Sequence, residues 1–170
     1  MLPAGAPSLF TRSCARFSRV LLWAAVVLLI GIILCVQWQV IGRYIFNDSP
    51  TWAEALAMLL VLYVTAFGAA VGVRDGSHVG FETVAQLLPP AGQRALLVVS
   101  HALVAVFGLV MAWSGWVWAS GKWTEVKPML GVPDALDYVP LVIAGLLIAL
   151  FSLEHVLCTL AGTEVEPAWN

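Results

Sequence analysis

Apolar residues fill four long stretches of this chain, and short polar segments separate them. A helix needs about 20 mainly apolar residues to cross a bilayer, and each of the four stretches reaches that length. We therefore predict an all-α integral membrane protein with four transmembrane helices, in which residues 1–170 form a single membrane domain. The predicted helices cover about residues 17–46, 52–73, 94–120 and 140–160.

Two further segments are too short to span a membrane. Residues 79–88 are apolar but number about ten, so we expect a short interfacial helix between the second and third transmembrane helices. The arm before the first helix carries Arg12, Arg16 and Arg19. These arginines indicate either another short helix on the cytoplasmic leaflet, where basic residues attract anionic lipid, or a solvated basic flank.

The composition agrees with a membrane protein. Of the 170 residues, 61% are apolar and only 11% are charged, whereas about a quarter are charged in soluble proteins. Basic residues are more numerous on one side of the predicted membrane, so we expect both termini in the cytoplasm. The cytoplasmic group would be Arg12, Arg16, Arg19, Arg74 and Arg94, and the periplasmic group Arg43, Lys122 and Lys127. Cys14, Cys35 and Cys158 form no disulfide framework and no metal-binding spacing.

The densest polar segment, residues 37–54, lies between the first two predicted helices. Arg43 at the end of the first helix either reaches lipid headgroups or pairs with a carboxylate such as Glu54. The second helix has two possible starts. Either Ser49 caps it, or Thr51 caps it with Glu54 three residues later as a capping box.

Small residues four positions apart occur in two of the predicted helices, as Gly68 with Gly72 and as Gly108 with Ala112. Such spacing lets helix backbones approach closely in lipid, so we expect the glycine face of the second helix to pack against another helix. Six of the eight tryptophans fall near the predicted periplasmic side, which indicates an interfacial aromatic belt or a protein interface. They are Trp38, Trp52, Trp113, Trp116, Trp118 and Trp123.

The predicted membrane interior has little chemistry. We find no convergent titratable groups for catalysis and no internal repeats or interrupted helices of a self-sufficient transporter. We therefore expect neither an enzyme nor a protein that moves a polar solute alone. One alternative remains, because antiparallel packing would place His101 and His155 at similar depth, where two imidazoles could ligate haem iron in a four-helix membrane cytochrome.

Three segments together resemble a known family. They are Arg43-Tyr44-x-x-Asn47-x-Ser49-x-x-Trp52-x-Glu54, then Arg74-x-Gly76-x-His78-x-x-x-Glu82, and Gly131-Val132-Pro133 before the last helix. In this order, with four helices, they resemble the small membrane subunit of tripartite ATP-independent periplasmic (TRAP) transporters, the DctQ-like family. Two positions depart from it, since Ala55 stands where a second acidic residue is frequent and Glu82 replaces the commoner aspartate.

The resemblance implies a non-catalytic small permease subunit of a sodium-coupled transporter for organic acids in the bacterial inner membrane. It further implies that the large membrane subunit carries the solute and sodium sites, so no cofactor is expected in this chain. The expected partners are that large subunit, whose scaffold the small subunit would stabilise, a periplasmic substrate-binding protein and the lipid bilayer. No nucleic acid partner is expected.

The residue patterns and the resemblance together suggest roles for individual residues. We expect a structural or subunit-interface role for eleven of them, with Arg43 fixing the periplasmic hairpin and Arg74 ordering the cytoplasmic loop against the large subunit. The eleven are Arg43, Tyr44, Asn47, Ser49, Trp52, Glu54, Gly68, Gly72, Arg74, His78 and Glu82. Lys122 and Lys127, in the polar loop before the last helix, are expected to help dock the substrate-binding protein.

Overall fold

The computed structural model describes residues 9–48, 50–76 and 89–161, and it is almost entirely helical there. The elements are α1 (Leu9–Ile45), α2 (Thr51–Gly76), α4 (Pro90–Gly121), the short 3₁₀ helix η1 (Asp134–Asp137) and α5 (Val139–Ala161). These ranges contain no strand, only an isolated bridge between Val126 and Pro133. The four long helices are each apolar enough to cross a membrane, so the predicted all-α transmembrane fold is confirmed.

The largest difference from the sequence prediction is the start of α1. This helix begins at Leu9, so Arg12, Arg16 and Arg19 belong to its first turns and not to a separate interfacial helix. Because the segment contains no proline, nothing interrupts the helix before the apolar stretch. With 37 residues, α1 is about 55 Å long, well beyond the roughly 30 Å hydrocarbon core.

Two other segments bear on the predicted boundaries. The helix α4 begins at Pro90, four residues before the predicted start at 94. Proline suits the first helical position, because its fixed φ matches the helix and its missing N–H would have no partner there. The predicted interfacial segment 79–88 lies outside the described residues.

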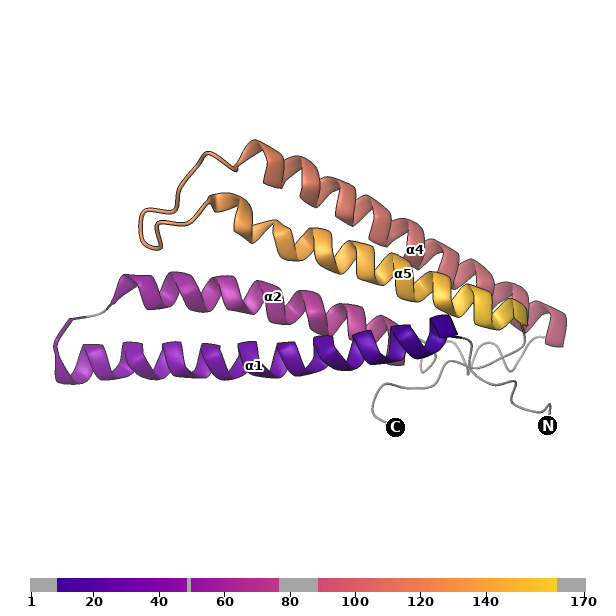
Figure 1. The fold of residues 1–170 in the computed structure, drawn as a ribbon, viewed down its shortest axis with the longest axis horizontal. Coiled ribbons are helices and arrows are strands. Elements are labelled where there is room, and N and C mark those ends of the chain that lie inside the picture. Colours follow the sequence, from indigo (N-terminus) through magenta and orange to yellow (C-terminus); the bar gives the residue numbers. More distant parts are fainter. Residues whose placement is uncertain (1–8, 49, 77–88, 162–170) are drawn as a thin grey trace.

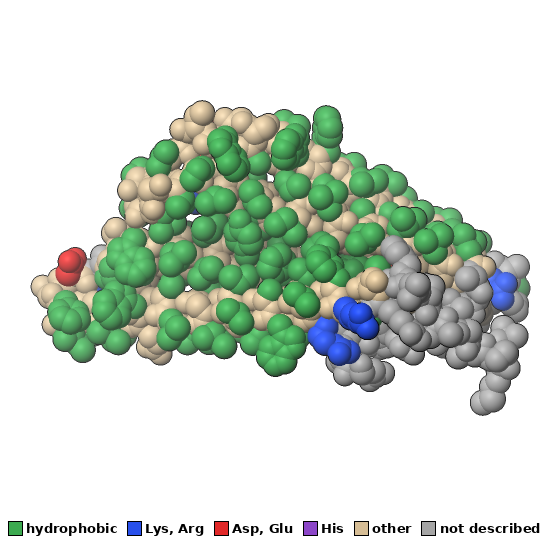
Figure 2. Space-filling view, in the orientation of Figure 1, with side chains coloured by type: hydrophobic (Ala, Val, Ile, Leu, Met, Phe, Trp, Pro, Cys, Tyr) green, Lys and Arg blue, Asp and Glu red, His purple; other side chains and the backbone are tan. Residues whose placement is uncertain are grey.

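The helices form an open layer and not a closed bundle. Figure 1 shows two hairpins, α1 with α2 and α4 with α5, which spread apart toward the turn between α1 and α2. The hairpins meet where α2 packs on α5, so the order across the layer is α1, α2, α5, α4. In the described ranges α4 contacts neither α1 nor α2. Most large apolar side chains are therefore exposed, as the space-filling surface in Figure 2 shows.

The hairpin of α4 and α5 is held together by small residues. A Cβ atom added to Gly145 would lie 2.5 Å from both the Ala112 nitrogen and the Gly108 oxygen. The two backbones are therefore in direct contact at this crossing, which is the use that the spacing of Gly108 and Ala112 suggested.

The other pair of glycines lies in a different environment. A Cβ atom at Gly68 or Gly72 would meet no other atom within 4 Å. The expectation that this face of α2 packs against another helix is therefore wrong for the helices of this chain.

This contrast gives a first prediction. Gly145→Ala should destabilise the protein by about 1–3 kcal/mol, because the added methyl group overpacks the crossing. Gly68→Ala should leave stability unchanged or raise it, because alanine favours a helix and finds open space at this position. Thermal unfolding of both variants in detergent, followed by circular dichroism, measures the difference. Equal unfolding temperatures would show that the close crossing is not needed.

Candidate functional site

The strongest polar feature is an ion pair buried between the two hairpins. The Arg74 side chain, near the end of α2, donates from Nε to Glu154 Oε2 at 3.2 Å and from Nη2 to Oε1 at 3.3 Å. Neither side chain has exposed surface. Arg74 Nη1 also donates to Asp75 Oδ1 at 3.2 Å, and the guanidinium lies 5.9 Å from the centre of the Phe151 ring. This two-pronged contact joins α2 to α5.

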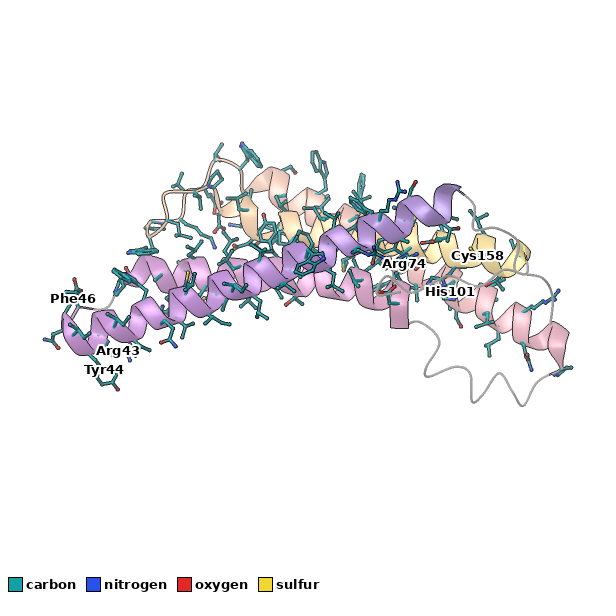
Figure 3. All side chains as sticks on the ribbon, turned by 60° about the horizontal axis from the view of Figure 1, so that its bottom comes forward. Arg43, Tyr44, Phe46, Arg74, His101 and Cys158 are labelled. Carbon is teal, nitrogen blue, oxygen red and sulfur yellow. The ribbon has the colours of Figure 1, made fainter. Side chains whose placement is uncertain are left out.

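The other helices contribute to the same cluster. His155 Nε2 donates a hydrogen bond to the Arg74 backbone oxygen at 2.9 Å, and the His155 ring stacks on His101 of α4. Cys14 of α1 is buried in the core that also contains Phe151 of α5. Figure 3 shows the labelled Arg74, His101 and Cys158 close together where the helices converge. We call Cys14, Arg74, Asp75, His101, Glu154 and His155 the buried polar cluster.

The contacts of the buried polar cluster indicate a structural role, which is to hold the helices together. Removing one partner of a buried ion pair typically costs about 3–5 kcal/mol, because the remaining charge has no compensation. Its acidic, histidine and cysteine side chains do not converge as metal ligands do, and no group of three or more such residues in the described part of the chain could hold a metal ion. Within the cluster Arg74 is paired with the carboxylates of both Asp75 and Glu154.

The two histidines do lie at the same depth, as their positions in the sequence suggested, but their geometry does not fit haem. Their ring centres are 4.6 Å apart with the planes only 6° from parallel. Axial imidazoles present nitrogen atoms to an iron between them, whereas His101 and His155 present their ring faces to each other. His155 Nε2 is also committed to the Arg74 oxygen. The cytochrome alternative is therefore not favoured.

The hairpin turn between α1 and α2 exposes several of the residues that resemble the family. Arg43, Tyr44 and Phe46 point away from the protein at this tip (Figure 3), with Tyr44 82% exposed. Asn47 takes a left-handed conformation with φ of 49°, which asparagine tolerates better than most residues. The Gly42 oxygen accepts hydrogen bonds from the Phe46 and Asp48 backbone nitrogens, both at 3.1 Å.

Arg43 and Glu54 are both exposed, and no ion pair joins these two described residues. Arg43 is therefore available to lipid headgroups or to another protein. Trp52 is 46% exposed, and Glu54 lies in the first turn of α2. Ser49, His78 and Glu82 lie outside the described residues.

The loop between α4 and α5 uses both of its lysines internally. Lys122 Nζ lies 2.6 Å from Glu125 Oε2 and 3.9 Å from Asp134 Oδ2, and Lys127 Nζ lies 2.5 Å from Asp137 Oδ2. The hydrogen bond to Glu125, with the charge of that carboxylate, raises the pKa of Lys122. The loop is therefore ordered by its own ion pairs.

The sequence analysis did not identify Glu154 and His155 as partners of Arg74. Glu154 itself could have indicated this contact, because it is an ionisable residue in an otherwise apolar helix. Ionisable residues in transmembrane segments usually have a specific partner. Arg74 was assigned to the cytoplasmic loop. Its side chain is instead wholly inside the chain, where it contacts α5.

The ion pair gives a second prediction. Glu154→Gln should destabilise the protein by about 3–5 kcal/mol, because it removes the carboxylate that makes the two-pronged contact with the buried Arg74 charge. The combined Arg74→Met, Asp75→Asn and Glu154→Leu variant should lose less, since none of the three buried charges then remains. Glu125→Gln, at an exposed ion pair, is the matched control and should have little effect. Urea unfolding in detergent measures all three. Equal effects of Glu154→Gln and Glu125→Gln on the free energy of unfolding would contradict a stabilising role of the buried ion pair.

Comparison with known proteins places these features in one family. The family model described as "Tripartite ATP-independent periplasmic transporters, DctQ component" matches residues 32–162. A putative TRAP transporter small permease protein of Haemophilus influenzae is 24% identical over 72% of this chain and 76% of its own length. The C4-dicarboxylate TRAP transporter small permease protein DctQ of Vibrio cholerae is 24% identical over 59% of this chain and 45% of its own length.

A third relative is much longer. The sialic acid TRAP transporter permease protein SiaT of Haemophilus influenzae is 34% identical over 39% of this chain, which is 11% of SiaT. The family and the four apolar helices together make this chain a multi-pass protein of the inner membrane. The chain belongs to the DctQ component family of TRAP transporters, and it is a transporter subunit and not an enzyme.

Proposed function

We propose that this small permease subunit stabilises the scaffold of the large membrane subunit in a sodium-coupled transporter for organic acids. The observation that carries the proposal is the open layer of helices with apolar surface on the outside. A layer with apolar side chains on its outer surface can pack side by side with another membrane protein in the bilayer. Among the described residues, the buried charges of Arg74, Asp75 and Glu154 pair with one another.

Two relatives support the partner and the solute class. In SiaT, a segment similar to this chain makes up 11% of one long permease polypeptide. That arrangement supports a permanent association between the small subunit and a large permease. The names of the relatives refer to sialic acid, C4-dicarboxylates and ectoine, and the first two are organic acids. We place the solute and sodium sites on the large subunit, with no cofactor in this chain.

We further propose an orientation with both termini in the cytoplasm. Exposed Arg16 and Arg19 in the first turns of α1 support it, because basic residues before the first transmembrane segment favour the cytoplasmic side. The loop of residues 122–138 and the tip of the α1–α2 hairpin would then face the periplasm. In this position they form a surface on which a substrate-binding protein could dock.

Arg43 provides the test of subunit assembly. Arg43→Ala should weaken association with the large subunit about tenfold, because arginine is frequently a dominant contact in protein interfaces. Lys122→Ala is the matched control, since Lys122 is occupied by its own loop. The measurement is the amount of large subunit that co-purifies with the tagged chain in mild detergent.

The same complexes, reconstituted into proteoliposomes, report the transport function. Uptake of an organic acid should need the substrate-binding protein and an inward sodium gradient. If Arg43→Ala and Lys122→Ala both assemble and transport as the wild type does, Arg43 has no special role. If no large subunit co-purifies with the wild-type chain, the scaffold role itself is wrong.

The docking surface gives a separate prediction. Lys127→Glu should raise the concentration of loaded binding protein needed for half-maximal uptake, and the effect should shrink as salt is added, because surface charges are screened. The exchange Lys127→Asp with Asp137→Lys is the control, since it rebuilds the loop ion pair with the charges interchanged. If the exchange restores uptake fully, the lysine serves only the loop and not docking.

A further inference from the structure

The two hairpins of the layer reach different heights above the buried ion pair. Both α2 and α5 run toward this pair, which joins Arg74 to Glu154. The helix α2 begins at Thr51, about 34 Å of helix before Arg74, whereas α5 begins at Val139, about 22 Å before Glu154. The tip of the α1–α2 hairpin therefore extends about 12 Å farther from the ion pair than the start of α5 does. Figure 1 shows the same difference in reach.

The helix α5 has no length to spare for crossing a membrane. Its 23 residues extend for about 34 Å, and the hydrocarbon core is roughly 30 Å thick. The two hairpins spread apart (Figure 1), so they cannot both lie along the bilayer normal, and tilt shortens the reach of a helix across the bilayer. The loop of residues 122–138, which precedes α5, is therefore level with the lipid headgroups and does not stand above them.

This loop exposes apolar side chains at that level. Trp123, Val126 and Met129 are 60%, 59% and 58% exposed. Keeping apolar surface in water costs about 25 cal/mol per Å², and tryptophan prefers the headgroup layer of a bilayer. Trp116 and Trp118 of α4, just before the loop, are exposed as well. The loop thus continues the tryptophan-rich end of a transmembrane helix.

The polar groups of the loop contact one another. Its five charged side chains take part in ion pairs, which join Lys122 to Glu125 and Asp134, and Lys127 to Asp137. Backbone hydrogen bonds of 2.8–2.9 Å between residues 125–127 and 131–134 fold the loop back on itself. Polar groups that are satisfied within a segment suit a membrane environment, because lipid offers few hydrogen-bonding partners.

We propose that the loop of residues 122–138 is inserted into the headgroup layer, where Trp123, Val126 and Met129 contact lipid and fix the depth of the α4–α5 hairpin. A soluble partner above the membrane would contact the top of this loop, not the apolar edge at this depth. The inference does not depend on the role proposed for the large subunit. The proposed orientation determines only that the lipid belongs to the periplasmic leaflet.

Spin labelling tests where the loop lies. Val126→Cys and Met129→Cys are made separately in a Cys35→Ser chain, labelled with a nitroxide and reconstituted, with whatever partner co-purifies, into vesicles of phosphatidylethanolamine and phosphatidylglycerol. Cys14 and Cys158 are buried, and the same chain without a new cysteine gives their residual labelling. Electron paramagnetic resonance then measures collisions of each label with oxygen, which concentrates in lipid, and with a water-soluble nickel chelate. Circular dichroism verifies that each variant is folded.

The ratio of oxygen to nickel collisions gives the result. At Val126→Cys and Met129→Cys it should match phospholipids labelled near the headgroup, and it should exceed the ratio at Tyr44→Cys, which is 82% exposed at the α1–α2 tip in the native chain.

Three outcomes would overturn the proposal. A ratio typical of labels in water would place the loop above the membrane. Few collisions with either reagent would show that another protein covers it, and repeating the measurement with and without the substrate-binding protein would identify which one. A ratio at Tyr44→Cys equal to that of the loop would contradict the difference in height.

Discussion

The ion pair between Arg74 and Glu154 is the contact on which the arrangement of the helices depends. Lipid removes the hydrophobic driving force for helix association, so helices in a membrane are held by close packing and by polar contacts. Within each hairpin the two helices are consecutive in the chain, and the connection between them helps to keep them together. Between the hairpins, α2 and α5 share the main interface, and a buried two-pronged ion pair lies in it. Losing either charge would leave the other in a medium that cannot solvate it.

The surroundings of this pair explain how it is tolerated. The Arg74 backbone oxygen is satisfied by His155, and its guanidinium faces two carboxylates, those of Asp75 and Glu154. Cys14 of α1 lies in the buried core beside this pair, together with Phe151 of α5, and His101 of α4 joins through its ring contact with His155. All four long helices are therefore fastened near one end of the layer. The opposite ends can spread apart, as they do in Figure 1.

Apolar length alone predicted the four helices, because this signal is local to each stretch of sequence. The start of α1 was missed because Arg12, Arg16 and Arg19 look like a flank until the uninterrupted helix is seen. The ion-pair partner of Arg74 could not be read from the sequence, since it depends on α5 lying beside α2. The spacing of small residues also did not reveal which pair of positions packs against another helix of this chain. Gly108 with Ala112 and Gly68 with Gly72 share one pattern, yet only the first pair is packed within this chain.

That difference between the two hairpins bears directly on function. The crossing of α4 and α5 is closed by backbone contact, so it needs nothing from outside. The surface of α1 and α2 stays open, with exposed apolar side chains and open space beside Gly68 and Gly72. In a bilayer this surface must be covered by lipid or by another transmembrane protein, because water is excluded there. A helix layer that is closed on one hairpin and open on the other is suited to join a larger membrane assembly through the open one.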